Sequence, residues 1–291
     1  MYNGILLLNK EPGFTSHDAV AKLRGILRFR RIGHAGTLDP MAQGLLVMLL
    51  GKATRASEYA SGAKKEYIAD FILGVETDTQ DTTGNVLAEA PVDVTESQLR
   101  QALSSFEGGY DQVPPMYSAI QKDGVRLYDL ARKGKEVERE SRFIALPLLE
   151  LLSFDPPRGK LRVRCSKGTY IRTLCHDIGQ ALGCGGVMAT LRRTMAAGFD
   201  LSQAVTMDEI LSAEDAPALL LSVDSYFSDY PAVNIYGEAE RRCRNGNRFS
   251  AKGENGRFRV YGENGEFLML GERKDGVMST VKSFFAPPEQ K

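Results

Sequence analysis

The stretch that decides most about this chain is RIGHAGTLDPMAQG, residues 31–44. It is rich in glycine and carries one carboxylate, Asp39, one histidine, His34, and Pro40. Local propensity favours a structural role for Asp39, because aspartate is a preferred N-cap and proline a preferred first residue of a helix. Asp39 would then cap a helix that continues into residues 45–50. His34 taken alone is more typical of a loop histidine with satisfied hydrogen bonds than of a catalyst.

The segments on both sides of this stretch predict a chain of mixed α and β structure. Strands are predicted at residues 4–8, 65–73 and 160–165. Helices are predicted to start near Thr15 or Ser16, Thr95, Arg126, Tyr170 and Thr206. Residues 160–165 alternate apolar and basic side chains, which indicates a strand with one face in the core and a basic face outside. The Asp123-Gly124 pair is typical of a hairpin turn.

The character of the sequence changes after Tyr230-Pro231. Turn-forming pairs then recur at regular intervals: Asn245-Gly246, Asn255-Gly256, Asn264-Gly265 and Asp275-Gly276. Short alternating segments separated by such pairs predict a meander of hairpins, hence a small all-β barrel or sandwich. We therefore expect two domains, residues 1–232 and residues 233–291.

The formal net charge is zero, with 37 basic and 37 acidic residues. This zero is a sum over alternating blocks, because residues 22–31 and 158–172 contain bases without acids, while residues 195–240 contain acids without bases. Neutrality argues against indiscriminate polyanion binding. It is compatible with a selective nucleic-acid partner if the basic blocks converge on one face. Any single block taken alone is better explained as chance clustering on a solvated face.

Several classes of protein are excluded by what the sequence lacks. The longest purely apolar run, residues 45–50, is far short of the roughly 20 residues of a membrane span, and there is no signal peptide, so a cytoplasmic protein is expected. The four cysteines have no metal-site spacing. The GKAT segment at residues 51–54 lacks the spacing of a phosphate-binding loop. We expect neither a metal nor a nucleotide cofactor, and, without a coiled coil, a monomer.

The segment GHAGTLDP, residues 33–40, resembles the catalytic motif of the TruB-type pseudouridine synthases, the bacterial enzymes that isomerise uridine 55 in the TΨC loop of tRNA. Five further segments resemble the family in the expected order. They are GILLLNKEPGFTS at 4–16, KEY at 65–67, PPMYSA at 114–119, SKGTYIRTL at 166–174 and LRRT at 191–194. The resemblance implies an α+β pseudouridine synthase fold, with a mixed, largely antiparallel sheet flanked by helices. It also implies an RNA-gripping insertion at about residues 110–145 and a small C-terminal all-β, PUA-like RNA-binding domain.

The resemblance further implies the catalytic residues. Asp39 would be the nucleophile, attacking either C1′ of the ribose or C6 of the base, a choice that the sequence leaves open. Arg172 would orient this carboxylate and lower its pKa. Tyr67 would handle a proton and stack on the base.

Other residues are implied in substrate binding. Tyr170 and Leu191 would be walls of the uracil pocket, His34 would insert into the RNA to support the flipped base, and Lys10 would bind substrate. Basic residues of the insertion are candidates for phosphate contacts, namely Lys122, Arg126, Arg132 and Lys133.

The implied activity is therefore the isomerisation of a tRNA uridine, with the T-arm stem-loop as partner and no cofactor. The alternative is a non-catalytic RNA-binding or tRNA-folding protein. It is disfavoured because binding alone does not require a carboxylate in a cleft that attracts anions. A metal or nucleotide hydrolase is disfavoured because its motifs are absent.

Overall fold

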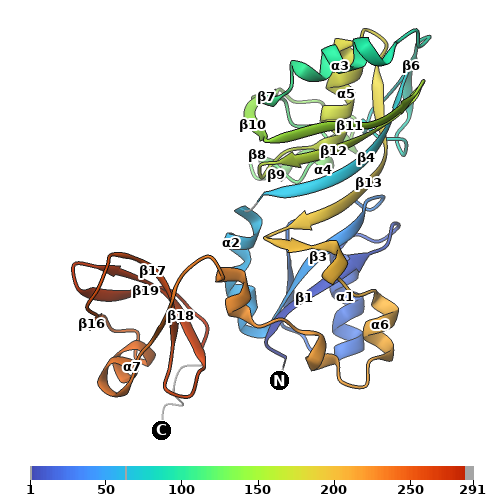
Figure 1. The fold of residues 1–291 in the computed structure, drawn as a ribbon. Helices are drawn as coiled ribbons and strands as arrows, with labels where there is room; N and C mark the ends of the chain where they lie inside the picture. Colours follow the sequence, from blue (N-terminus) through green and yellow to red (C-terminus); the bar gives the residue numbers. More distant parts are fainter. Residues whose placement is uncertain (1, 63, 286–291) are drawn as a thin grey trace.

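The computed structural model describes residues 2–62 and 64–285, and an eight-stranded sheet forms the larger part of the molecule (Figure 1). Its strands follow in the order β1 (Gly4–Lys10), β3 (Gln43–Leu50), β13 (Gly186–Ala196), β4 (Lys65–Leu73), β12 (Arg158–Cys165) and β11 (Leu148–Asp155), with β2 (Ile32–Ala35) beside β3 and β14 (Phe199–Asp200) beside β13. The β3–β13 pair is parallel and the other pairs are antiparallel. The expected mixed, largely antiparallel sheet is confirmed.

Helices flank this sheet at both ends. They are α1 (Ser16–Leu27), α2 (Ser57–Gly62), α3 (Glu96–Ser104), α5 (Ile171–Ala181) and α6 (Met207–Ser212). Helices α1 and α6 lie at the β1 end, α5 packs against β13 and β4, and α3 packs against α5 and β11 (Figure 1). Four 3-10 helices join these elements: η1 (Gly51–Ala56), η2 (Leu201–Gln203), η3 (Ala216–Leu219) and η4 (Val223–Phe227). None of the helices within the described ranges has the length and apolarity needed to cross a membrane.

All five predicted helix starts are confirmed, since Arg126 and Tyr170 also directly precede a helix, and the other three starts have a local cause. Thr15, Thr95 and Thr206 are N-caps, and each forms a capping box with the residue three positions later. The threonine hydroxyl accepts from a free backbone N–H of the first turn, while the later side chain accepts from the threonine N–H. These contacts stay within four residues, which is why the sequence predicts them.

The helix expected at residues 45–50 is wrong, because these residues belong to strand β3. Leu46, Met48 and Leu50 enter one hydrophobic core, whereas the intervening apolar residues enter a second core on the opposite face. A strand buried on both faces needs a continuous apolar run. Asp39 therefore caps no helix; its carbonyl accepts from the Ala42 N–H in a turn, at 3.0 Å.

The basic face of β12 is confirmed, but it is paired with acids of the neighbouring strand β4. Glu66 lies 2.8 Å from Arg164 and 3.4 Å from Arg162, and Lys160 lies 3.3 Å from Asp70. An acidic and a basic block of the sequence thus meet on adjacent strands. The block at residues 158–165 does not form a separate cationic face.

Smaller sheets flank the central one. β5 (Val75–Thr77) pairs with β6 (Val86–Glu89), and β7 (Gly108–Gln112) pairs with β10 (Arg142–Leu146). Between β7 and β10 the chain forms the insertion, residues 113–141, with the short hairpin β8 (Gln121–Lys122) and β9 (Val125–Arg126) and helix α4 (Leu127–Ala131). The predicted Asp123-Gly124 turn closes this hairpin.

The C-terminal region is a separate five-stranded sheet with one helix (Figure 1). Its elements are β15 (Ala232–Asn234), α7 (Gly237–Arg244), β16 (Phe249–Ser250), β17 (Gly256–Tyr261), β18 (Phe267–Lys274) and β19 (Val277–Ser283). Two of the four predicted hairpin turns are confirmed, Asn264-Gly265 between β17 and β18 and Asp275-Gly276 between β18 and β19. Asn245-Gly246 instead follows α7, and Asn255-Gly256 leads into β17 without a hairpin to β16, because β16 pairs with β19.

Candidate active site

A cavity of about 400 Å³ opens where five segments of the larger part meet. These are the loop of residues 36–39, the start of β4, the insertion, the segment of residues 166–172 that leads into α5, and the middle of β13. Five of the residues singled out in the sequence line this cavity: Asp39, Tyr67, Tyr170, Arg172 and Leu191. They come from four separate elements, so the fold alone brings them together.

Asp39 and Arg172 form an ion pair at the cavity wall. One terminal nitrogen of Arg172 lies 3.0 Å from each carboxylate oxygen of Asp39. The Arg172 side chain is 9% exposed, whereas that of Asp39 is 32% exposed. The carboxylate is therefore reachable from the cavity, and the guanidinium that holds it is buried in the wall.

The expected effect of Arg172 on Asp39 is only part of what sets its pKa. Burial raises the pKa of Asp39 above its ordinary value and is the largest effect, while the charge of Arg172 opposes it. The neighbouring carboxylate of Asp81 raises the pKa further, and Lys10 lowers it. Arg172 therefore lowers the pKa as expected, but the net shift is upward, because desolvation penalises the charged form more strongly.

Asp81 is a buried residue of the site that the sequence did not reveal. It lies 3.7 Å from the other terminal nitrogen of Arg172. Its carboxylate accepts from the Thr79 hydroxyl at 2.8 Å and from the Thr83 N–H at 3.0 Å. Arg172 thus lies between two carboxylates, one exposed to the cavity and one fixed within a turn. An acid in a long acidic segment gives no local signal for this position.

Three side chains fix the backbone of the Asp39 loop. Arg193 is fully buried, and its guanidinium donates to the carbonyls of Gly36, Thr37 and Leu45 at 2.7–3.2 Å. Ser16 Oγ accepts from the N–H of the Leu38 backbone at 2.9 Å and donates to the carbonyl of the same residue at 3.2 Å. Lys10 Nζ donates to the carbonyls of Glu11, Phe14 and Pro40. Residues on both sides of Asp39 are therefore held from the core, and buried polar groups so paired rigidify a site.

Lys10 and His34 do not line this cavity. Lys10 is 2% exposed and supports the loop from below through Pro40. His34 lies on β2 with its ring 5.5 Å from that of His17, edge to face. Burial lowers the pKa of His34, with smaller contributions from His17 and Arg193 in the same direction. A neutral imidazole is therefore favoured at this position.

Tyr67, Tyr170 and Leu191 supply the aromatic and apolar walls. Tyr67 and Leu191 are 7% and 6% exposed. Burial raises the pKa of the Tyr67 hydroxyl and outweighs the opposing charge of Arg193, so the hydroxyl keeps its proton. Tyr170 is half-buried, with the Arg142 guanidinium 5.5 Å from its ring centroid. The cavity therefore has two aromatic walls and one aliphatic wall, which favour stacked and edge contacts with a planar ring.

The insertion reaches the cavity through Tyr117, Ser118, Ala119 and Tyr128. Arg126 and Arg132 lie over the ring of Tyr128, at 5.7 Å and 5.4 Å from its centroid. Lys122 Nζ donates to the Glu138 carbonyl at 2.8 Å, and Lys133 is exposed. The insertion therefore places two guanidinium groups, those of Arg126 and Arg132, against a tyrosine that lines the cavity.

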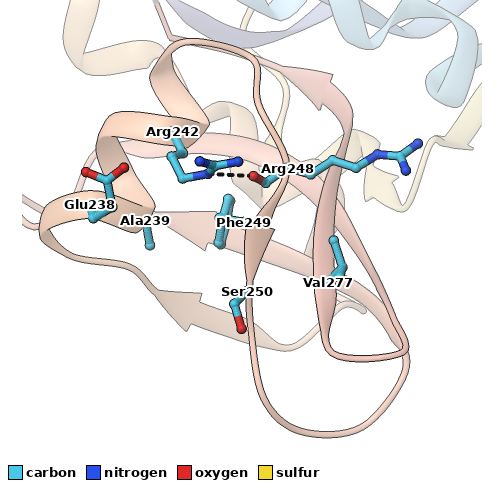
Figure 2. Close-up of a pocket in the computed structure, with 7 residues that line it drawn as sticks. All are labelled: Glu238, Ala239, Arg242, Arg248, Phe249, Ser250 and Val277. Carbon is cyan, nitrogen blue, oxygen red and sulfur yellow. Dashed lines mark hydrogen bonds between the residues drawn. The ribbon is translucent and has the colours of Figure 1, made fainter.

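A second hollow of about 510 Å³ lies in the C-terminal region, between α7 and β16 (Figure 2). Its lining residues are Glu238, Ala239, Arg242, Arg248, Phe249, Ser250 and Val277. Arg242 Nε donates to the Arg248 carbonyl at 2.8 Å, and the Arg248 side chain points away from it (Figure 2). The carboxylate of this hollow, Glu238, is exposed and pairs with a likewise exposed guanidinium, that of Arg241, at 2.6 Å. A carboxylate held by a buried guanidinium is found instead in the Asp39 cavity. Among the described residues, no cluster of His, Cys, Asp or Glu is placed to hold a metal ion.

Two family models match the chain, one after the other. The model of the TruB family pseudouridylate synthase N-terminal domain matches residues 24–171. The model of the tRNA pseudouridylate synthase B C-terminal domain matches residues 172–226. The junction of the two matches falls between Tyr170 and Arg172, within the wall of the cavity.

Curated relatives resemble the chain over most of its length. The tRNA pseudouridine synthase B of Opitutus terrae is 53% identical over 209 residues, which cover 72% of this chain and 87% of that protein. The tRNA pseudouridine synthase B of Syntrophotalea carbinolica is 46% identical over 243 residues, which cover 82% of this chain and 79% of that protein.

Solved structures share the fold almost from end to end. The crystal structure of a Cbf5-Nop10-Gar1 complex matches with a TM-score of 0.75 and 27% identity, covering 98% of this chain and 85% of the matched chain. The structure of an H/ACA RNP bound to a substrate RNA containing 2′-deoxyuridine matches with a TM-score of 0.74 and 25% identity, covering 98% and 86%. The likeness extends beyond residue 226, where the family models stop, into the C-terminal sheet.

Proposed function

Because the chain belongs to the TruB family of pseudouridylate synthases, it isomerises uridine in tRNA, and we propose that its target is uridine 55 in the TΨC loop. The observation that carries the proposal is the Asp39 carboxylate, which lines a cavity and is held by Arg172 at 3.0 Å. In the reaction the N1–C1′ bond breaks, the base turns over and a C5–C1′ bond forms. The C5 proton is released to water and N1 gains a proton.

We propose that Asp39 is the nucleophile and carries a covalent intermediate, formed at C1′ of the ribose or at C6 of the base. Only the ionised carboxylate can attack, so Arg172 has to oppose the effect of burial on its pKa. Tyr67 keeps its proton because burial raises the pKa of its hydroxyl, and it is the proposed group for proton handling and stacking. Tyr170 and Leu191 are the proposed walls of the uracil pocket.

The uridine must leave its folded RNA loop to reach Asp39, which costs a few kcal/mol of unstacking. His34 is the proposed support for the flipped arrangement; its neutral, half-buried ring suits insertion between bases. For Lys10 the contacts favour a different role from the substrate binding implied by the family resemblance, namely support of the Asp39 loop.

The proposed partner is the T-arm stem-loop of tRNA, gripped by the insertion. Lys122, Arg126, Arg132 and Lys133 are the proposed phosphate contacts there. We propose residues 233–291 as a PUA-like RNA-binding domain, with Arg242 and Arg248 at its hollow. A tRNA substrate favours a cytoplasmic location, and a monomer stays the prediction for the oligomeric state.

Release of tritium from C5 of uridine tests the proposed target. Unmodified tRNA labelled at this position is incubated with the protein in the presence of a chelator, and the tritium in water is measured. Release is expected from the parent transcript and not from one in which cytidine replaces uridine 55. Equal release from both would overturn position 55. No release at stoichiometric protein would favour the alternative, a tRNA-folding protein.

Asp39→Ala tests the proposed nucleophile. We expect this variant to lose turnover while its tRNA affinity stays within about tenfold of the parent, because the phosphate contacts remain. Its melting temperature should be close to that of the parent, since Asp39 caps no helix. Residual turnover within tenfold of the parent would contradict the assigned role.

A further inference from the structure

Gln112 makes a two-point contact with the backbone of Tyr170. It is the last residue of β7 and is 1% exposed. Its Oε1 accepts from the Tyr170 N–H at 2.9 Å, and its Nε2 donates to the Tyr170 carbonyl at 3.1 Å. Only the nitrogen of the amide can donate, so this pair of partners fixes its orientation. The side chain thus pairs with Tyr170 as an adjacent strand would.

Tyr170 needs this partner because of its place in the chain. It is the N-cap of α5, and its own side chain makes no capping hydrogen bond. The N-terminal backbone of a helix carries N–H groups without partners inside the helix. The Gln112 side chain, which is 1% exposed, accepts from one such N–H group, that of Tyr170. It does so from outside the helix and in a single geometry.

A tyrosine anchors Gln112 to the same helix. The Tyr110 hydroxyl accepts from Gln112 Nε2 at 2.7 Å and donates to Asp177 Oδ2 at 2.6 Å. Asp177 lies in α5. Strand β7 therefore holds α5 at two points, at its N-cap through Gln112 and within the helix through Asp177.

The residue opposite Gln112 holds the same wall. Arg142, its register partner on β10, donates to the Gly168 carbonyl at 2.9 Å and lies 5.5 Å from the Tyr170 ring centroid. The chain between these two residues is the insertion, residues 113–141. Both residues at the base of the insertion therefore contact the Tyr170 segment.

From these contacts we propose that Gln112 is a positioning residue that couples the base of the insertion to Tyr170 and, through the first turn of α5, to Arg172. The inference rests on the proposed function, because it assigns the insertion to RNA and Tyr170 to the uracil pocket. When RNA loads the insertion, the rigid pair Gln112–Tyr170 keeps the pocket wall at its place relative to Asp39. Misplacement of a positioning element by about 1 Å can lower a rate roughly a hundredfold.

Three variants separate positioning from simple stability. Gln112→Met keeps the size of the side chain and removes all its hydrogen bonds. Gln112→Glu keeps an oxygen that can accept from the Tyr170 N–H. Its carboxyl can donate to the Tyr170 carbonyl only when it is protonated. Gln101→Met is the control, because Gln101 is an exposed residue of α3, away from the cavity lining. The measurements are hydrogen exchange of the Tyr170 amide by NMR, tRNA affinity, and the single-turnover rate of tritium release.

For Gln112→Met we expect faster exchange of the Tyr170 amide, a rate roughly ten to a hundred times lower, and an affinity within about threefold of the parent. For Gln112→Glu, the ratio of its rate to that of the parent should rise as the pH falls, since protonation restores the donor. A purely structural role would not give this rescue. Gln101→Met should match the parent in every measurement.

The outcomes distinguish the two proposals. Unchanged Tyr170 exchange in Gln112→Met would overturn the coupling, whatever the activity. Faster exchange with an unchanged rate would also overturn it, because Gln112 would then be structural only. An inactive parent would count against the proposed function while the exchange measurement still decides the Gln112 contact. If Gln112→Met fails to fold, the pH dependence of Gln112→Glu decides the role.

Discussion

The chemistry of Asp39 is set by two opposing effects on one carboxylate. Burial and Asp81 favour its neutral form, whereas Arg172 and Lys10 favour the charged form. If Asp39 is the nucleophile, as proposed, it must be ionised, and we predict that the rate rises with pH as Asp39 loses its proton. Because the net pKa shift is upward, this acid limb is predicted to lie above the ordinary range for an aspartate.

Arg172→Lys is predicted to move that acid limb to higher pH and to lower the plateau rate, because a single ammonium cannot bridge Asp39 and Asp81 as the guanidinium does. Single-turnover tritium release between pH 5 and pH 8 measures both effects. Arg162→Lys is the control, since Arg162 pairs with Glu66 on β4. Matching profiles for the two variants would contradict the electrostatic role of Arg172.

Residues at this site differ in how far the sequence could reveal them. Asp39, Tyr67 and Arg172 lie in segments whose resemblance to a family is visible, and the structure brings them to one cavity. Ser16 and Arg193 lie in two other segments that resemble the family. Their roles nevertheless depend on backbone carbonyls and N–H groups far away in the chain. A side chain that binds backbone leaves no pattern in the residues that it binds, so these roles needed the fold.

At the scale of elements, the backbone position of the Asp39 loop depends on the close parallel pairing of β3 and β13. Gly44 pairs with Arg193 in parallel register and has a φ of +102°. A Cβ atom there would lie 2.4 Å from the Arg193 carbonyl oxygen, which is too close for any side chain. The strand that carries Arg193 to the loop can therefore approach only because residue 44 is glycine.

Gly44→Ala is predicted to lower the free energy of unfolding by about 2–4 kcal/mol, through strain at positive φ and a displaced β13. Gly13→Ala is the matched control, with a φ of +88° but open space around the missing Cβ. It should cost only about 1 kcal/mol. Urea unfolding measures both, and equal losses would show that the close approach to Arg193 has no consequence.

The charged blocks also act at the scale of elements. Bases of β12 pair with acids of β4, whereas Arg132 and Lys133 belong to the insertion beside the cavity. Counterion release upon RNA binding reports only the cations that contact phosphate. The two groups of bases are therefore distinguishable by the salt dependence of binding.

Arg132→Gln and Lys133→Gln are each predicted to reduce the slope of log affinity against log salt by about 0.7–0.9, the value for one lost phosphate contact. Arg162→Gln should leave the slope unchanged, because its charge is already paired. Filter binding of tRNA across a salt series gives the slopes. A reduced slope for Arg162→Gln alone would reverse the assignment.

A helix could be predicted from the sequence where residues close together in the chain determine its start. The capping boxes at Thr95 and Thr206 fix helix starts within four residues. Residues 45–50 could not be assigned, because whether an apolar run is a strand depends on cores that other elements supply on both faces. Asn245-Gly246 and Asn264-Gly265 look alike in sequence, yet one follows a helix and the other closes a hairpin, since strand pairing is decided at long range.

At the scale of the whole molecule, the C-terminal sheet is joined to the rest by an aromatic cluster. Phe227 of η4 is 1% exposed, with its ring centroid 5.5 Å from that of Phe284 and 5.9 Å from that of Phe267. Polar contacts at the same junction join Arg55 to Ser283 and Lys282 to Glu58. The two parts therefore share a hydrophobic core and are not independent units joined only by a linker.

That shared core has a practical consequence for anyone who shortens the chain. A protein ending at Pro231 would keep the Asp39 cavity but leave Phe227 and its apolar neighbours open to water. Exposed apolar patches of this kind promote self-association. We predict that this shortened protein scatters light and precipitates at concentrations where the full chain stays clear. Phe227→Ser should restore part of its solubility, and a clear solution of the shortened protein would contradict the prediction.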